Sequence, residues 1–178
     1  LGRINDAILH FESAFRYDPK NPFTALEVAN SYLYSYDLEN AEIYHKKTIF
    51  LAPDVDLYYR DLAELYYWMG KTNKALAVLD NGLKLLKSDN LLFAKAWLET
   101  VARNYEKSLE TLNSIELNIY IKQTEFTPIE TFYGINFMHL GQMDKAIEYF
   151  NKSKAILENA IEKTPKDIRI HSEYAIVL

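Results

Sequence analysis

The chain has 178 residues, 49% of them hydrophobic, and a net charge of −5 from 20 basic and 25 acidic side chains. It contains no cysteine, which excludes disulfides, thiolate zinc sites, iron–sulfur clusters and cysteine nucleophiles. The charges are spread evenly, with 10 basic and 13 acidic residues in 1–89 and 10 and 12 in 90–178, so no basic cluster favours nucleic-acid binding.

No apolar run is long enough to span a bilayer, and residues 1–20 lack the pattern of a signal peptide. We therefore expect a cytoplasmic protein. Leu1 is not an initiator Met, and a helical pattern is cut at Leu178. We interpret the chain as a piece of a longer protein.

Segments of the chain resemble one another at a fixed offset. Ala7 recurs as Ala41 and as Ala75, and Pro19 recurs as Pro53. A period of about 34 residues is typical of a pair of helices that buries its apolar face only against neighbouring pairs. The sequence therefore predicts a stack of helical hairpins.

The second and third units each read as two helices. Apolar residues at helical spacing predict helices over 22–35, 39–51, 57–69 and 73–86. Pro53 ends the second of these, and Gly70 and Gly141 each follow a helix at a place suited to left-handed backbone. Small residues mark the close approaches between paired helices, at Ala29, Ala63 and Gly134 in the first helices and Ala41, Ala75 and Ala146 in the second.

The fourth unit departs from this plan. Ser108 follows Ala75 one position earlier than the period requires, and Asn104 stands where Gly would turn the chain. Either Ala96 or Trp97 takes the position that Ala29 and Ala63 hold in the preceding units. Residues 116–127 form a longer connection, after which the pattern returns with a second helix of unusual length, about 143–163. A single array results, with units at 1–21 (partial), 22–55, 56–89, 90–127 (irregular), 128–167 (extended) and 168–178 (partial).

These recurring residues resemble the tetratricopeptide repeat family. The first-helix signature is Val28-Ala29-Tyr32, Leu62-Ala63-Tyr66 and Tyr133-Gly134-Phe137, and the second-helix signature is Ala7-Phe11-Ala14-Pro19, Ala41-His45-Thr48-Pro53 and Ala146-Phe150-Ser153. The resemblance implies an all-α fold, a right-handed superhelix of about four and a half helix-turn-helix repeats. More narrowly, the irregular fourth unit, the long helix and residues 164–175 look like the repeat tails of bacterial signalling and transcription-regulator proteins.

In this family the first helices line a concave groove that binds partners. The resemblance places these partner-binding residues in the groove: Phe23, Leu26, Asn30, Tyr34, Arg60, Glu64, Tyr67, Trp68, Ile135 and Met138. It also places Leu33, Leu57, Thr131 and His139 on that side. The lining is rich in aromatic residues, which carry much of the energy of interfaces. Alternatively, neighbouring repeats or another domain cover these side chains.

The sequence contains few residues in arrangements typical of catalytic or metal-binding sites. The four histidines are scattered, and no metal-binding, phosphate-binding or nucleophile motif occurs. We therefore expect no catalysis, no cofactor and no metal. Members of the family that clamp a terminal carboxylate use Lys and Asn at set places, where this chain has Leu26, Asn30, Asp61, Leu91 and Lys95. Only Asn30 and Lys95 fit, so a carboxylate clamp is disfavoured.

The sequence thus favours a noncatalytic scaffold whose groove binds a protein partner, as a peptide or a helix. The alternative is a regulatory or sensor tail of a larger bacterial signalling or transcription-regulator protein. Self-association through exposed end repeats is a third option.

Overall fold

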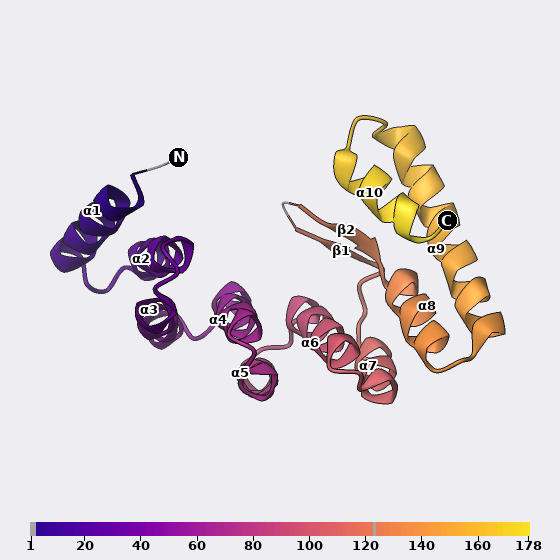
Figure 1. Cartoon of the computed structure of the whole chain (residues 1–178), viewed down its shortest axis with the longest axis horizontal. Helices are drawn as coiled ribbons and strands as arrows, with labels where there is room; N and C mark the ends of the chain where they lie inside the picture. Colours follow the sequence, from indigo (N-terminus) through magenta and orange to yellow (C-terminus); the bar gives the residue numbers. More distant parts are fainter. Residues whose placement is uncertain (1–2, 123) are drawn as a thin grey trace. The chain divides into compact units, whose positions relative to one another are not determined.

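A computed structural model describes residues 3–122 and 124–178. Residues 1 and 2 of the predicted partial unit, and residue 123 of the predicted connection, lie outside this description. The described residues form ten helices and one two-stranded hairpin (Figure 1). They fall into two compact units, Leu1–Leu91 and Leu92–Leu178. The predicted all-α fold class is confirmed, and each unit is built from antiparallel helix pairs.

The first unit contains five helices. They are α1 (Ile4–Tyr17), α2 (Pro22–Tyr34), α3 (Leu38–Leu51), α4 (Asp56–Trp68) and α5 (Thr72–Leu85). Helix α2 pairs with α3 and α4 with α5, while α1 packs on α2 and α3 on α4. The predicted bounds of α2 to α5 are correct to within one residue at each end.

Local signals in the sequence fix where these helices begin. Pro22 occupies the first turn of α2, and the side chain of Asn21 accepts a hydrogen bond from the amide of Thr24. The side chain of Asp37 caps α3 in the same way, through the amide of Asn40. Such caps satisfy amides that have no partner within the helix.

Small side chains let the paired helices approach closely. Ala29, Ala41, Ala63 and Ala75 are buried, as the sequence predicts. At Gly82 of α5 an added Cβ would lie 2.9 Å from side-chain atoms of Leu91 and of Tyr59. The repeat pattern therefore records the contacts between helices.

The second unit is less regular. Its elements are α6 (Asp89–Val101), which begins at the end of the first unit, α7 (Tyr105–Leu112), β1 (Ile119–Ile121), β2 (Phe126–Pro128), α8 (Ile129–His139), α9 (Met143–Lys163) and α10 (Ile168–Ile176). Helix α8 packs on α7 and α9, and α10 packs on α9. The bounds of α9 match the predicted 143–163.

The structure settles the register of α6. Ala96 is fully buried while 37% of Trp97 is exposed, so Ala96 takes the small-residue place. The left-handed residue of the following turn is Arg103, with φ 62°, in the place of Gly70, with φ 69°. The prediction that Asn104 holds this place is wrong, because the shortened repeat brings the turn forward by one position.

The predicted connection 116–127 contains most of a β-hairpin. Strands β1 and β2 are antiparallel, with Tyr120 opposite Thr127. The Tyr120 side chain is buried and stacks on Phe93 of α6, with the ring centroids 4.8 Å apart. It belongs to a core cluster with Ala96 and Leu112. The hairpin therefore covers apolar surface that α7, with only eight residues, leaves open.

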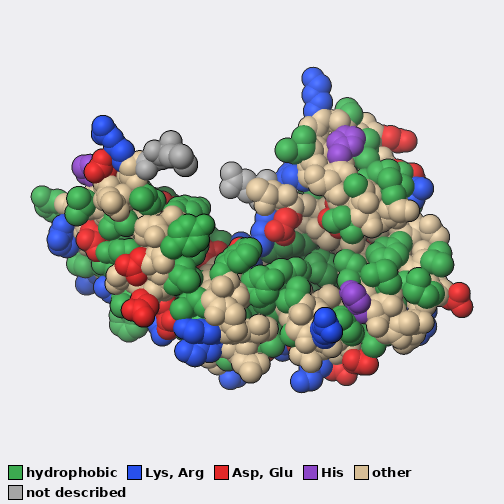
Figure 2. Space-filling view, viewed as in Figure 1, with side chains coloured by type: hydrophobic (Ala, Val, Ile, Leu, Met, Phe, Trp, Pro, Cys, Tyr) green, Lys and Arg blue, Asp and Glu red, His purple; other side chains and the backbone are tan. Residues whose placement is uncertain are grey.

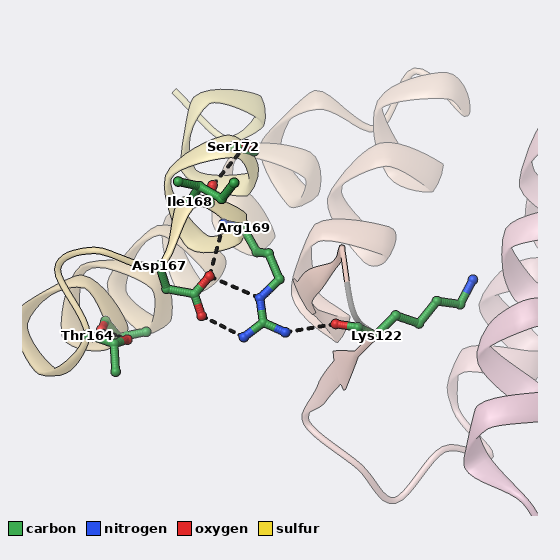
Figure 3. Close-up of polar contacts among 7 residues, drawn as sticks. Lys122, Thr164, Asp167, Ile168, Arg169 and Ser172 are labelled. Carbon is green, nitrogen blue, oxygen red and sulfur yellow. Dashed lines mark hydrogen bonds and ion pairs between the residues drawn. The ribbon is translucent and has the colours of Figure 1, made fainter. Parts of the chain in front are cut away.

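The end of α9 carries a second cluster of the same unit. Leu157 packs with Ile170 and Val177 of the α10 segment and with Phe126 of β2. Figure 3 shows the polar link beside it, where the Arg169 guanidinium forms an ion pair with Asp167 at 2.6 Å and its Nη1 donates to the main-chain oxygen of Lys122 at 2.8 Å. The extension of α9 thus supports both α10 and the hairpin.

Candidate interaction surface

The predicted groove residues of the first unit lie on its two first helices, α2 and α4. Phe23, Tyr34 and Trp68 expose 63%, 72% and 66% of their surface, and Glu64 is also exposed. Three others, Asn30, Arg60 and Tyr67, are half-buried. Figure 2 shows that hydrophobic side chains reach the surface of both units.

Leu26 does not belong to this exposed set. Only 8% of its surface is accessible. The prediction of an open groove position is wrong for this residue, because it is packed within the unit as the alternative reading of the sequence expects. Its apolar side chain contributes to the core of the unit and not to a binding surface.

The aromatic residues recur at matched places. Tyr34 and Trp68 are the last residues of α2 and α4, and they occupy equivalent positions of successive repeats. The Tyr67 ring meets Trp68 edge-on, with centroids 5.5 Å apart. Edge contacts of this kind orient an aromatic side chain without burying it. The two helix ends therefore present large apolar groups to solvent, and at the end of α4 the contact with Tyr67 orients Trp68.

Polar groups hold the start of α4 in place. The carboxylate of Asp56 accepts hydrogen bonds from Ser88 Oγ at 2.6 Å and from Asn90 Nδ2 at 3.1 Å. Burial alone raises the pKa of Asp56, but these bonds and the nearby Arg60 guanidinium outweigh it, so the pKa is lowered. Asp56 therefore stays ionised and fixes the link between α5 and α6 against α4.

In the second unit the predicted residues lie on α8. Met138 is 40% exposed and Ile135 is half-buried. Thr131, which the family pattern places in the groove, is buried, and its hydroxyl bonds to Ser153 Oγ at 2.7 Å. The exposed His139 stacks on Tyr105 of α7 with ring centroids 4.8 Å apart, which gives the imidazole a packing role.

Sequence reasoning missed two surface residues of α6. Trp97 and Val101 are 37% and 42% exposed, and the shortened repeat matches them to Glu64 and Trp68. The open choice between Ala96 and Trp97 hid this correspondence. The same register matches Phe93 to Arg60, and Phe93 lies beneath Tyr120 of the hairpin. The hairpin therefore covers the beginning of the α6 surface and leaves its end open.

Among the residues that the structure describes, no group of three or more His, Asp or Glu side chains could hold a metal ion. His45 is buried in α3, and neither ring nitrogen has a hydrogen-bond partner. Burial lowers the pKa of His45 to about 4, so the imidazole is neutral at pH 7. A neutral, enclosed imidazole acts as a core residue.

Across residues 3–122 and 124–178, every helix is too short or too polar to cross a bilayer.

No protein-family model matches this chain. In sequence it is 26% identical to human "Tetratricopeptide repeat protein 13" over 159 residues, which cover 85% of this chain. The chain spans only 18% of the length of that protein.

Solved structures resemble the chain in fold. The crystal structure of MamA matches with a TM-score of 0.71 and 18% identity, covering 89% of this chain and 91% of MamA. TTC0263, a tetratricopeptide repeat protein of Thermus thermophilus, matches with a TM-score of 0.65 and 20% identity over 99% of this chain and 91% of TTC0263. YrrB, described as a tetratricopeptide repeat protein with an unusual peptide-binding site, matches with a TM-score of 0.60 and 16% identity over 94% and 81%. The predicted resemblance is confirmed: the chain is similar to tetratricopeptide repeat proteins and shares their fold.

Proposed function

We propose that this chain is a noncatalytic protein-interaction scaffold. It binds a peptide or a helix of a partner protein on the surface formed by the first helices of its repeats, α2 and α4 in the first unit. The observation that carries this proposal is the recurrence of exposed aromatic residues at matched helix ends, Tyr34 on α2 and Trp68 on α4. Isolated exposed apolar residues are common on any protein, whereas residues repeated at one structural position form a surface.

The chemistry of this surface suits a mainly apolar ligand. Burial of Tyr34 and Trp68 drives binding at about 25 cal/mol for each Å² of apolar area removed from water. Tyr and Trp also keep a polar group for hydrogen bonding at the edge of the contact. Asn30, Glu64 and Arg60 lie on the same helices, and they fix the direction of the bound segment. YrrB shares the fold and carries a peptide-binding site, which supports this use of the architecture.

The test uses peptides selected on the wild-type chain from a phage-displayed random library. Dissociation constants are then measured by fluorescence polarisation for the wild type and for the double variant Tyr34→Ala with Trp68→Ala. We expect binding to weaken by at least about tenfold, as for aromatic hot spots. Helical circular dichroism should stay unchanged, because both side chains are exposed.

A matched control removes two equally exposed aromatic residues from second helices, Tyr17 of α1 and Phe50 of α3, which are 89% and 83% exposed. Their replacement by Ala should leave binding within about twofold of the wild type, because residues outside an interface contribute little. Equal losses from both double variants would overturn the assignment of the surface.

The regulatory-tail function, self-association through the end repeats and a cytoplasmic location stay predictions of the sequence. They concern neighbouring domains, a second copy or a compartment, and the double variant on α2 and α4 tests none of them.

A further inference from the structure

One edge of the β-hairpin offers main-chain groups that no other part of the described chain uses. The amide of Lys122 donates to the oxygen of Glu125 at 3.0 Å, and the amide of Ile129 donates to the oxygen of Asn118 at 2.9 Å. Hydrogen-bonded pairs alternate along an antiparallel ladder. Tyr120 and Thr127 therefore form the bonded pair between these two, and Ile119 and Ile121 direct their N–H and C=O groups away from β2.

The outer edge of β1 is open, whereas β2 is covered. Strand β2 packs against α8, α9 and α10. Within residues 3–122 and 124–178, neither Ile119 nor Ile121 has a hydrogen bond on the side away from β2. Unpaired main-chain groups on an edge strand form a template for another extended segment.

This edge is held rigidly by contacts at three points. Tyr120 is buried on Phe93 of α6, and the Lys122 oxygen accepts from Arg169 of α10 (Figure 3). The Asn118 oxygen accepts from the first amide of α8. A strand that is already fixed loses little conformational entropy when it pairs, so more of the hydrogen-bond energy is available for binding.

From this geometry we infer that β1 binds an extended peptide of a partner protein, which adds to its outer edge as a third strand. The inference rests on the proposed interaction function and specifies an extended ligand conformation in the second unit. The side chains beside the edge are apolar and exposed, with Leu117 at 48% and Ile121 at 55%. Trp97 follows Phe93 by one helical turn on α6. The bound segment therefore carries apolar side chains.

A second copy of this chain fits the edge less well. Pairing two three-residue strands buries far less than the roughly 1,200–2,000 Å² that a stable interface between proteins needs. A flexible peptide can instead follow the edge and continue over the exposed end of α6, where Trp97 and Val101 lie.

Substitution of Ile121 separates main-chain pairing from side-chain contact. Ile121→Pro removes the outward N–H and leaves the bond between Lys122 and Glu125 in place, and edge strands tolerate Pro at such positions. Against peptides selected from the phage-displayed library, we expect Ile121→Pro to weaken binding by at least about tenfold. Ile121→Val keeps the N–H and should stay within about twofold of the wild type.

Amide exchange measured by NMR provides a readout that does not depend on the Pro variant. In the free protein the amides of Ile119 and Ile121 should exchange rapidly and that of Tyr120 slowly, and the selected peptide should protect the first two. If Ile121→Pro fails to fold, this protection decides the inference alone.

The remaining outcomes each overturn the inference. Loss of binding on replacing Tyr34 and Trp68 but not on Ile121→Pro would leave the proposed function standing and remove the role of β1. Failure to select any peptide would remove both. A dimer of the peptide-free chain that Ile121→Pro converts to a monomer, measured by sedimentation, would assign the edge to a second copy.

Discussion

The two units cover their apolar helix faces by different means. In Leu1–Leu91, second helices α3 and α5 have 14 residues each and complete their pairs. In Leu92–Leu178, α7 has eight residues and the hairpin covers α6 instead, while α9 has 21 residues and supports α10. The fold therefore requires that each apolar helix face be covered, and a regular neighbouring helix is only one way to cover it.

The polar contacts of the two units differ in the same sense. In the first unit, tyrosines on first helices donate to glutamates on the preceding second helices, Tyr32 to Glu12 at 2.7 Å and Tyr66 to Glu42 at 2.8 Å. In the second unit, the buried Asn136 side chain donates to Ser108 Oγ at 3.1 Å and to the Phe132 oxygen at 2.8 Å. The regular first unit repeats one type of half-buried hydrogen bond, whereas the irregular second unit has a buried network that occurs at one place.

The largest predicted effect tests whether the hairpin serves as core. Tyr120→Ala removes a buried ring that stacks on Phe93. We expect the free energy of unfolding to fall by about 3–5 kcal/mol, as for other buried aromatic residues. Urea denaturation followed by circular dichroism measures it. The neighbouring Ile121→Ala, at a residue that is 55% exposed, should change stability by less than about 0.5 kcal/mol. Similar small losses from both would show that the hairpin lies outside the core.

A second prediction concerns acid and compares two equivalent repeat positions in the first unit. His45 and Leu79 occupy the same place in successive repeats, and both are buried. Because burial lowers the pKa of His45 from 6.5 to about 4, the folded state resists protonation that the unfolded state accepts. Stability is therefore complete above pH 6.5 and falls as the pH drops toward 4, by about 3 kcal/mol.

His45→Leu copies the residue of the next repeat and should remove this loss. The difference in unfolding free energy between His45→Leu and the wild type should widen by about 3 kcal/mol from pH 7 to pH 4, measured in urea at each pH. Parallel pH profiles would show that the imidazole reaches solvent.

Glu173 of the second unit provides a control, because acid should change its contribution to the unfolding free energy in the opposite direction. Burial raises the pKa of Glu173, against the lowering effect of hydrogen bonds from Thr131 and Thr127. Its charge therefore destabilises the folded state at neutral pH, and this cost disappears as the pH falls through the folded pKa toward the unfolded value. In the same urea measurements, Glu173→Gln should accordingly lose its stabilising effect in acid, whereas His45→Leu gains one.

The sequence predicted the first unit well because each position there is constrained in the same way in successive repeats. Ala29 and Ala63, or Ala41 and Ala75, meet the same close approach, so the residue type and the spacing carry the structure. It predicted exposed surface correctly for Phe23, Tyr34 and Trp68 but not for Leu26. A repeat position specifies the direction of a side chain, whereas burial depends on the size of the neighbours that happen to face it.

The second unit was harder to predict because its contacts join segments that no period relates. Nothing local in residues 116–127 indicates that Tyr120 packs on Phe93 of a distant helix. The exposed Trp97 and Val101 were missed for a simpler reason, a one-residue deletion that shifts the register of α6. The deletion is visible at Ser108, but the residues around position 96 do not distinguish between the two alignments.

The smallest effect tests this deletion directly, at the turns that separate paired helices. Gly70 and Arg103 share a left-handed conformation, and the same bonds close both turns, from Gly70 to the Tyr67 oxygen at 2.8 Å and from Arg103 to the Thr100 oxygen at 2.9 Å. A left-handed conformation costs a residue with a Cβ about 1 kcal/mol relative to Gly. Arg103→Gly should therefore raise the melting temperature, and Gly70→Ala should lower it.

Asn104→Gly distinguishes the shortened register from the regular one. Asn104 has φ −93°, where Gly gains nothing and only adds freedom to the unfolded chain. This variant should therefore be neutral or less stable by about 0.5 kcal/mol. Calorimetry of the three variants compares them under one condition. If Asn104→Gly raised the melting temperature and Arg103→Gly left it unchanged, the regular register would be correct. Trp97, and not Ala96, would then take the place of Ala63. The opposite result would show that one missing residue shifts the turn without changing its conformation, because the hydrogen bonds of the turn, and not the residue type, select the left-handed position.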